Sequence, residues 1–76
     1  MNYQGIITRD KEILGGKPII KGTRLSVELI LKKLSEGATV RDLLENYPHL
    51  QDVQVYAALE YTSVVVANEE IIDAAA

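Results

Sequence analysis

The sequence contains no cysteine and only one histidine among its 76 residues. The first absence excludes disulfide bonds, and the second excludes a structural zinc site, which draws about four ligands from Cys and His. Below about 70 to 80 residues, a core alone rarely supplies more than roughly 3–5 kcal/mol of stability. We therefore expect residues 1–76 to form a single domain without metal or cofactor, stabilised by assembly into a homodimer or a higher homo-oligomer.

Long apolar runs are also missing from the chain. No stretch of eighteen apolar residues occurs, and the N-terminal segment MNYQGIITRD lacks the basic and then apolar pattern of a signal peptide. With 47% hydrophobic and 25% charged residues, the composition is typical of a globular protein and too apolar for intrinsic disorder. These features predict a folded cytoplasmic protein without a membrane partner.

Positive charge is confined to the first 41 residues of the chain. No lysine or arginine follows Arg41, whereas seven acidic residues do, and the net charge is −3. Residues 1–25 hold five cations and two acids, a local balance of +3. A polyanion such as double-stranded DNA would therefore bind the first half, and a basic partner surface would bind the second.

Short apolar pairs separated by glycines characterise residues 1–25. Ile6-Ile7, Ile13-Leu14 and Ile19-Ile20 are too short for helices, and Pro18 fits only an edge or a turn. This pattern predicts two short strands, as a β-hairpin or an extended segment.

Two helices are expected next, at 26–36 and 40–47. In the first, Ser26 is a competent N-cap and Gly37 provides the stop. In the second, Thr39 and Asp42 have the spacing of a capping box, and Pro48 follows the end. The apolar residues have helical spacing in both segments: Val27, Ile30, Leu31 and Leu34, then Val40, Leu43, Leu44 and Tyr47.

A third helix is expected at about 52–67, and it is apolar on every side. Its predicted core line is Val55, Ala58, Leu59, Thr62 and Val66. A helix that is apolar all round is normally buried on more than one side, which again indicates a dimer. The fold class is therefore mainly α, with a three-helix helix-turn-helix core and a short N-terminal β-hairpin or extended segment.

Three sequence blocks, together with Gly37, carry a resemblance to a known family. GGKPIIKGTRLSV at 15–27, NYPHL at 46–50 and VYAALEY at 55–61 resemble the domain-of-unknown-function 433 family, from Ile7-Thr8 to the Glu-Ile-Ile-Asp near the end. The resemblance implies a homeodomain-like helix-turn-helix fold and, for many members, an antitoxin role beside a small PIN-like ribonuclease toxin. The family usually has Thr where this chain has Gln51, so we expect Asp52 to take over the N-cap.

The candidate DNA contacts are mainly cations of the first half, because the third helix has none. Lys21, Thr23 and Arg24 beside a helix start are typical of phosphate binding, but Arg24 is equally expected to pair with Asp42 or Glu28. The full candidate set is Arg9, Lys11, Lys17, Lys21, Thr23, Arg24, Lys32, Lys33, Gln51 and Gln54. The glycine pair 15–16 has two interpretations, an anion-binding loop or a plain tight turn.

Candidate residues for a dimer or partner interface lie on the third helix. They are Tyr56, Tyr61, Val64 and Val65, whereas Tyr47 is expected in the core. His49 has no nearby Ser or Cys partner and follows a proline, so no catalytic residue is predicted and we expect no enzyme.

Two hypotheses follow from these patterns. In the first, the chain is an antitoxin-like protein that binds operator DNA through its basic N-terminal half and a PIN-like nuclease toxin through its acidic C-terminal helix. In the second, it is a protein-interaction or assembly module without DNA binding, which the pI near 5.0 favours. Salt-sensitive DNA binding distinguishes the two.

Overall fold

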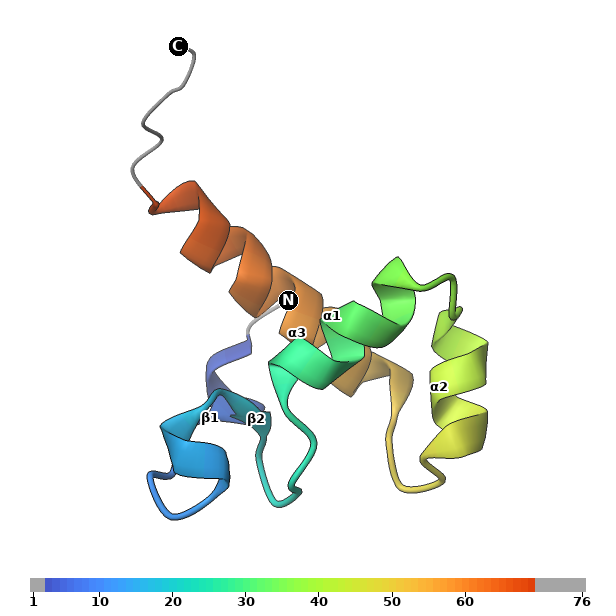
Figure 1. The fold of residues 1–76 in the computed structure, drawn as a ribbon, viewed down its shortest axis with the longest axis horizontal. Helices are drawn as coiled ribbons and strands as arrows, with labels where there is room; N and C mark the ends of the chain where they lie inside the picture. The colour runs from blue at the N-terminus through green and yellow to red at the C-terminus, as the bar shows by residue number, and fades with distance from the viewer. Residues whose placement is uncertain (1–2, 70–76) are drawn as a thin grey trace, which may run out of the picture.

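The computed structural model describes residues 3–69, and it is mainly helical with a small hairpin at the N-terminal end (Figure 1). This confirms the predicted fold class. In chain order the elements are the short 3-10 turns η1 (Tyr3–Gly5) and η2 (Leu14–Gly16), which alternate with strands β1 (Ile7–Thr8) and β2 (Ile19–Ile20), then helices α1 (Val27–Ser35), α2 (Val40–Asn46) and α3 (Asp52–Ala67). No helix among the described residues is long and apolar enough to cross a membrane.

The hairpin uses two of the three apolar pairs. β1 and β2 are antiparallel, with Ile7 opposite Ile20 and Thr8 opposite Ile19. The remaining pair forms no strand, because Leu14 has a φ of 52° and begins the turn η2 instead of extending. A left-handed backbone is strained for leucine, and the two glycines that follow continue it without that cost.

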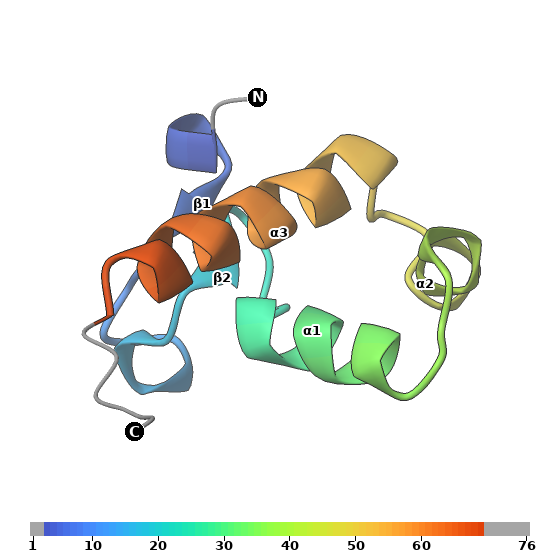
Figure 2. The ribbon, with the colours of Figure 1, turned by 90° about the horizontal axis from the view of Figure 1, so that it is seen from above.

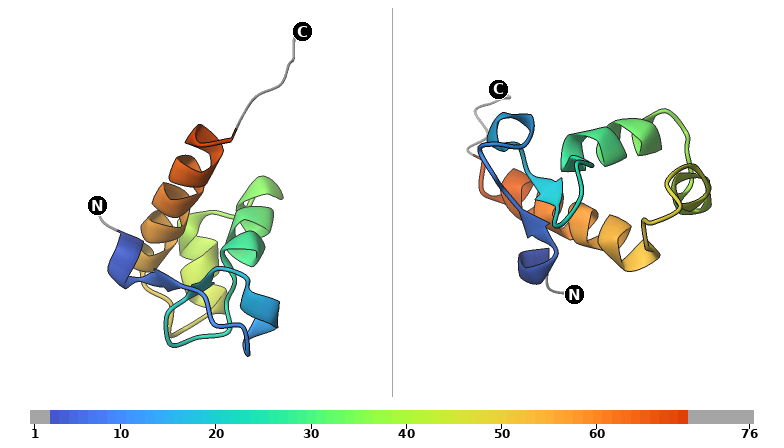
Figure 3. Two further views of the ribbon diagram at one scale, coloured as in Figure 1. Left: turned by 90° about the vertical axis from the view of Figure 1, so that its left-hand side faces the viewer. Right: turned by 90° about the horizontal axis from the view of Figure 1, so that it is seen from below.

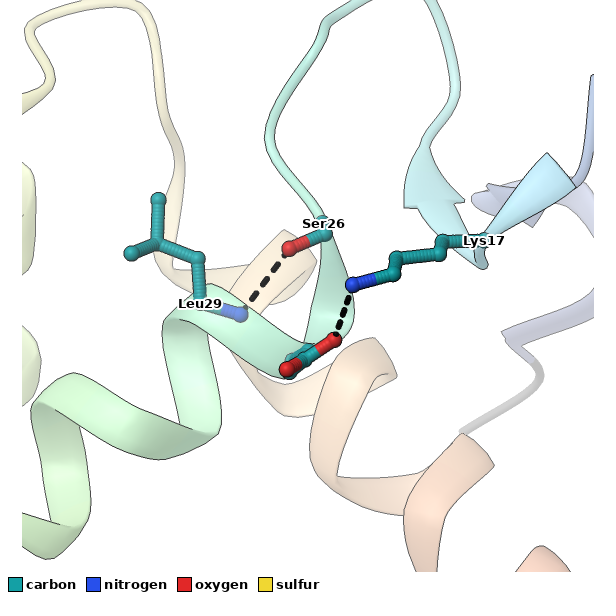
Figure 4. A network of polar contacts seen from close by, with 4 residues as sticks. Lys17, Ser26 and Leu29 are labelled. Atoms are coloured by element: carbon teal, nitrogen blue, oxygen red, sulfur yellow. Dashed lines mark hydrogen bonds and ion pairs between the residues drawn. The ribbon is translucent and has the colours of Figure 1, made fainter. Parts of the chain in front are cut away.

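Helix α1 begins where its cap predicts. Ser26 stays outside the helix, and its Oγ accepts a hydrogen bond from the Leu29 N–H at 2.9 Å (Figure 4). The helix is therefore one residue shorter at each end than the expected 26–36, because Ser26 is its cap and Glu36 closes it. Gly37 follows with a φ of 103°, a conformation that favours glycine.

Helix α2 contains the predicted capping box. The Thr39 N–H donates to Asp42 Oδ2 at 2.8 Å, and the Asp42 N–H donates to Thr39 Oγ1 at 3.1 Å. The helix ends at Asn46 instead of the expected residue 47, because Tyr47 has a φ of −129° and its N–H closes the last turn on Leu43. Tyr47 is half-buried and packs against the core, as expected.

Helix α3 has the expected bounds, and its valine triplet does not shorten it. The expectation for its N-cap was wrong, because the helix already includes Asp52 and Gln51 precedes it. The Gln51 N–H donates to Gln54 Oε1 at 2.8 Å, so a glutamine one turn later satisfies an amide that the helix leaves open.

The core lies where α3 crosses α1, with the hairpin at one end and α2 at the other (Figures 1 and 2). Val55, Ala57 and Ala58 are its contribution from α3, and each is fully buried. Leu59 and Val66 were predicted on the same core line, but they are 39% and 55% exposed. The core-facing side of α3 is thus rotated from the predicted one, because a helix that is apolar all round has no sequence signal for which side is buried.

Candidate functional site

Part of the predicted basic surface is engaged within the chain. Arg9 Nη2 donates to the Tyr61 hydroxyl at 2.7 Å, and Lys17 Nζ lies 2.8 Å from Glu28 Oε1 (Figure 4). The hydrogen bond and positive charge of Lys17 lower the pKa of the Glu28 carboxyl. Lys32 lies 3.7 Å from Glu36, one turn later. All three pairs are at the surface, where such contacts add little stability.

Four cations of the first half have no hydrogen bond or ion pair with residues 3–69: Lys11, Lys21, Arg24 and Lys33. The structural alternative for Arg24 is wrong within this part of the chain. Its side chain is exposed, while Glu28 pairs with Lys17 and Asp42 caps α2. Arg24 is therefore accessible to a ligand.

Thr23 has a structural role in the turn between β2 and α1. Its hydroxyl donates to the Ile20 carbonyl at 2.7 Å and accepts from the Leu25 N–H at 3.0 Å. With both bonds made inside the chain, the hydroxyl fixes the turn that presents Lys21 and Arg24. The glycine pair at 15–16 also has a structural role. The Gly16 N–H donates to the Ile13 carbonyl at 3.0 Å, as in a tight turn.

The start of α3 offers less for reading bases than its glutamines suggested. Gln51 is exposed, but the side-chain oxygen of Gln54 accepts the capping hydrogen bond and Gln54 is half-buried. The helix itself carries Asp52 and Glu60 and no cation. A negatively charged helix without lysine or arginine is a poor fit to the major groove.

The four expected interface residues lie on different sides of α3. Tyr61 is half-buried inside the chain, where its ring makes an edge contact with Tyr3 at a centroid distance of 5.2 Å. Tyr56 and Val65 are exposed and nine positions apart, which is two and a half turns at about 3.6 residues per turn, so they project in opposite directions. Val64 is exposed between them.

Tyr61 and Val65 border a hollow of about 300 Å³, here named the α1–α3 groove. Its wall is largely apolar, with the Arg9 and Glu28 side chains as the charged groups. The groove is lined by Arg9, Pro18, Val27, Glu28, Leu31, Tyr61, Thr62 and Val65. No local pattern predicted this groove, because its lining joins segments up to 56 positions apart (9 to 65).

The other side of α3 carries a line of exposed residues, here named the outer stripe: Tyr56, Leu59, Ser63 and Val66. The steps between them are three, four and three residues, the spacing of a coiled-coil seam. This heptad spacing is visible in the sequence, but the same residues Leu59 and Val66 also fit the predicted core line.

A second hollow, of about 410 Å³, lies between two of the sequence blocks that carried the family resemblance. The turn after β2 supplies Gly22, Thr23 and Leu25, and the connection from α2 to α3 supplies residues 46–50. His49 is exposed at its border. Figure 3 shows these two loops side by side at one end of the molecule. Among residues 3–69, no group of His, Cys, Asp or Glu side chains could hold a metal ion.

Known proteins share the sequence and the architecture of this chain. An uncharacterized protein, y4eO, of Sinorhizobium fredii is 34% identical over 56 residues, which cover 74% of this chain and 25% of that protein. The crystal structure of a DUF433 member from Anabaena variabilis matches with a TM-score of 0.79 and 30% identity, covering 84% of this chain and 63% of that one. The chain thus spans a quarter of the first relative and less than two thirds of the second. Residues 7–62 match the model of the family described as protein of unknown function (DUF433), and the chain belongs to that family.

Proposed function

We propose that this chain is an antitoxin-like regulator of the cytoplasm that acts by binding a protein partner in the α1–α3 groove, and not as an enzyme. One observation carries the proposal. Among residues 3–69, six of the seven large hydrophobic side chains that are exposed lie on α3, and one of these six, Val65, borders the α1–α3 groove. Apolar surface concentrated on one helix marks a protein interaction site, whereas scattered apolar residues do not.

The chemistry of the groove supports a helix of a partner protein as its occupant. Val65 is 40% exposed at the border, and the Leu31 and Val27 side chains provide apolar wall. Arg9 and Glu28 supply one charge of each sign, so a partner with mixed polar groups around an apolar anchor would be complementary. The acidic character of the second half favours a partner with a basic surface.

The class of that partner rests on the resemblance of the sequence blocks, because the family description itself gives no function. The resemblance to antitoxins encoded beside a PIN-like ribonuclease makes such a nuclease toxin the partner that we propose. Binding alone would then inhibit the nuclease, because a chain that covers its active site excludes RNA and needs no catalytic activity.

Affinity capture of the tagged full chain from its native cell, at moderate salt and with mass spectrometry, tests the proposal. A small ribonuclease in stoichiometric amount is expected, and its RNA cleavage should stop when this chain is added back. Val65→Glu places a charge in the groove and should abolish capture. Val64→Glu makes the same change one residue earlier, outside the groove, and should retain it. Recovery of no ribonuclease, or equal capture by both variants, would contradict the proposal.

We propose DNA binding as a second function, supported by the four first-half cations that pair with nothing in the described part. Lys21 and Arg24 lie in one turn, and the α2–turn–α3 unit resembles a helix-turn-helix. The pair of changes Lys21→Ala and Arg24→Ala should lower the salt dependence of operator binding by about two units of slope, at roughly 0.9 per phosphate contact. Absence of any salt-sensitive DNA binding would favour the assembly module without DNA.

A further inference from the structure

The hollow of about 410 Å³ between the turn after β2 and the α2–α3 connection, here named the loop hollow, is separate from the α1–α3 groove (Figure 3). Its size falls within the roughly 300–1,000 Å³ that is usual for small-molecule sites. Buried Leu50 and half-buried Leu25 and Tyr47 give it an apolar lining, and exposed polar residues border it. An apolar hollow with a few polar groups at its border is the common form of a ligand site.

The loop hollow differs from its neighbours in charge. The α1–α3 groove and a third hollow of about 310 Å³, between η2 and α1, both include Glu28 in their lining. The lining of the loop hollow includes no acidic residue. The closest acids along the chain are Glu45 and Asp52. Glu45 Oε2 lies 3.5 Å from Arg41 Nε, and Asp52 belongs to the first turn of α3, where the helix dipole favours a negative charge.

Unpaired donors surround the loop hollow. Lys21 and Arg24 are exposed in the same turn as three of the lining residues, and neither has a partner within residues 3–69. The backbone N–H groups of Gly22 and His49 also find no acceptor in this part of the chain. Gly22 has a φ of 81° and open space where a Cβ would stand, so a ligand can approach its backbone closely. Cations and free N–H groups together favour an anion.

The number of cations favours a phosphate monoester. Such a group carries a charge of about −1.5 to −2 at neutral pH, which two cations balance, whereas a carboxylate needs only one. The guanidinium of Arg24 is suited to phosphate, because its planar N–H groups bind two oxygens at once. Lys21 supplies the second charge from the same turn.

The other wall of the loop hollow favours a nucleobase. Tyr47 and His49 bring two aromatic rings from one short segment, and Asn46 adds a side-chain amide. None of these three side chains makes a hydrogen bond with another residue of 3–69. Aromatic rings stack on bases, and an asparagine amide can pair with the edge of adenine.

We propose that the loop hollow binds a nucleotide, with its terminal phosphate on Lys21 and Arg24 and its base against Tyr47 and His49. The same phosphate monoester occurs in a free nucleotide and at the 5′ end of a nucleic-acid strand. The site does not depend on the proposed nuclease partner. It shares two cations with the proposed DNA contacts, but duplex DNA presents internal phosphodiesters and no free base.

The first test is a titration of the isotope-labelled full chain by NMR, with adenosine 5′-monophosphate as the probe. Saturable shifts are expected for the amides of residues 22–25 and 46–50. Adenosine alone and inorganic phosphate alone should each bind about tenfold more weakly or worse, because each keeps only half of the contacts. No saturable shift, shifts centred elsewhere, or equal binding of inorganic phosphate would overturn the proposal.

Three variants at exposed positions separate the site from general attraction of anions. Arg24→Ala should weaken nucleotide binding about tenfold, and His49→Ala about fivefold through lost stacking. Lys33→Ala is the matched control, because it removes another exposed and unpaired cation outside the loop hollow, and it should leave the affinity unchanged. An equal loss in Arg24→Ala and Lys33→Ala, or no loss in His49→Ala, would refute the site.

A short single strand with and without a 5′-phosphate distinguishes the two sources. Tighter binding of the phosphorylated strand than of the free nucleotide would assign the site to a strand end, and equal or weaker binding would assign it to the free nucleotide. Duplex DNA binding should be insensitive to His49→Ala. A loss for the duplex as large as that for the nucleotide would contradict a site built for a free base.

Discussion

The orientation of α3 can be tested with one chemical change made at two places on the same helix. Val55 is fully buried in the core, and Val65 is 40% exposed at the groove. Both are valines of α3, Val55 in its first turn and Val65 in its last, so replacing either with alanine removes the same two methyl groups and brings a similar gain in helix propensity, at most about 0.5 kcal/mol. Only the surroundings of the side chain differ.

The expected difference follows from burial. Removing two buried methyl groups at Val55 loses about 1.6 kcal/mol of transfer free energy, and the cavity left adds roughly 1 kcal/mol. After the propensity gain, Val55→Ala should cost about 2 kcal/mol. Stabilities of roughly 0.05–0.15 kcal/mol per residue predict a total of about 4–11 kcal/mol for this chain. The loss is therefore a large share of the total and should lower Tm by about 8–16 °C.

Val65→Ala should change the free energy of unfolding by less than about 0.5 kcal/mol, as is usual for surface substitutions. Urea unfolding followed by circular dichroism at 222 nm measures both variants, at one fixed protein concentration because dimerisation would add to stability. Equal losses for the two variants, or a larger loss for Val65→Ala, would show that α3 is rotated differently and would refute the core assignment.

Four further predictions concern the caps, the charges and the turns. Thr39→Ala removes the hydroxyl of the capping box and should cost about 1 kcal/mol in urea unfolding. The backbone N–H and hydroxyl of Thr39 lower the pKa of Asp42. This carboxylate therefore stabilises the fold at pH values above the ordinary Asp pKa, and the stabilisation is lost as the pH falls through the lowered pKa. Asp42→Asn should flatten the acidic end of the curve of unfolding free energy against pH, and an unchanged curve would contradict this. Arg24→Ala should leave Tm unaltered, since no described residue pairs with it, and a marked drop would restore the structural interpretation. Gly37→Ala should cost about 1 kcal/mol because of its positive φ, measured in the same assay.

Local signals in the sequence were sufficient where a residue acts on its neighbours. The Ser26 cap and the Thr39–Asp42 capping box could be predicted because each joins residues three positions apart. The side of α3 that faces the core could not be predicted. Apolar residues occur all round this helix, and only its packing against α1 and the hairpin selects the buried side. Propensity and spacing carry no information about that selection.

The candidate site was predictable in composition but not in arrangement. The charge split between the halves is visible in the sequence, yet the bond from Arg9 to Tyr61 joins residues 52 positions apart. Likewise, the blocks at 15–27 and 46–50 were recognised separately, and only the fold brings Gly22, Thr23 and Leu25 against the segment 46–50. Such encounters depend on tertiary packing, which pattern analysis of single segments does not contain.

The contact of Arg9 and Tyr3 with Tyr61 also has a consequence for the chain during its synthesis. An isolated two-stranded hairpin is at best marginally stable in water, and this one has strands of only two residues. Its support comes from α3, the last helix to leave the ribosome. The N-terminal third therefore lacks this support until residue 61 has left the ribosome, so the part of the protein that is synthesised first cannot complete its packing before the last helix is made.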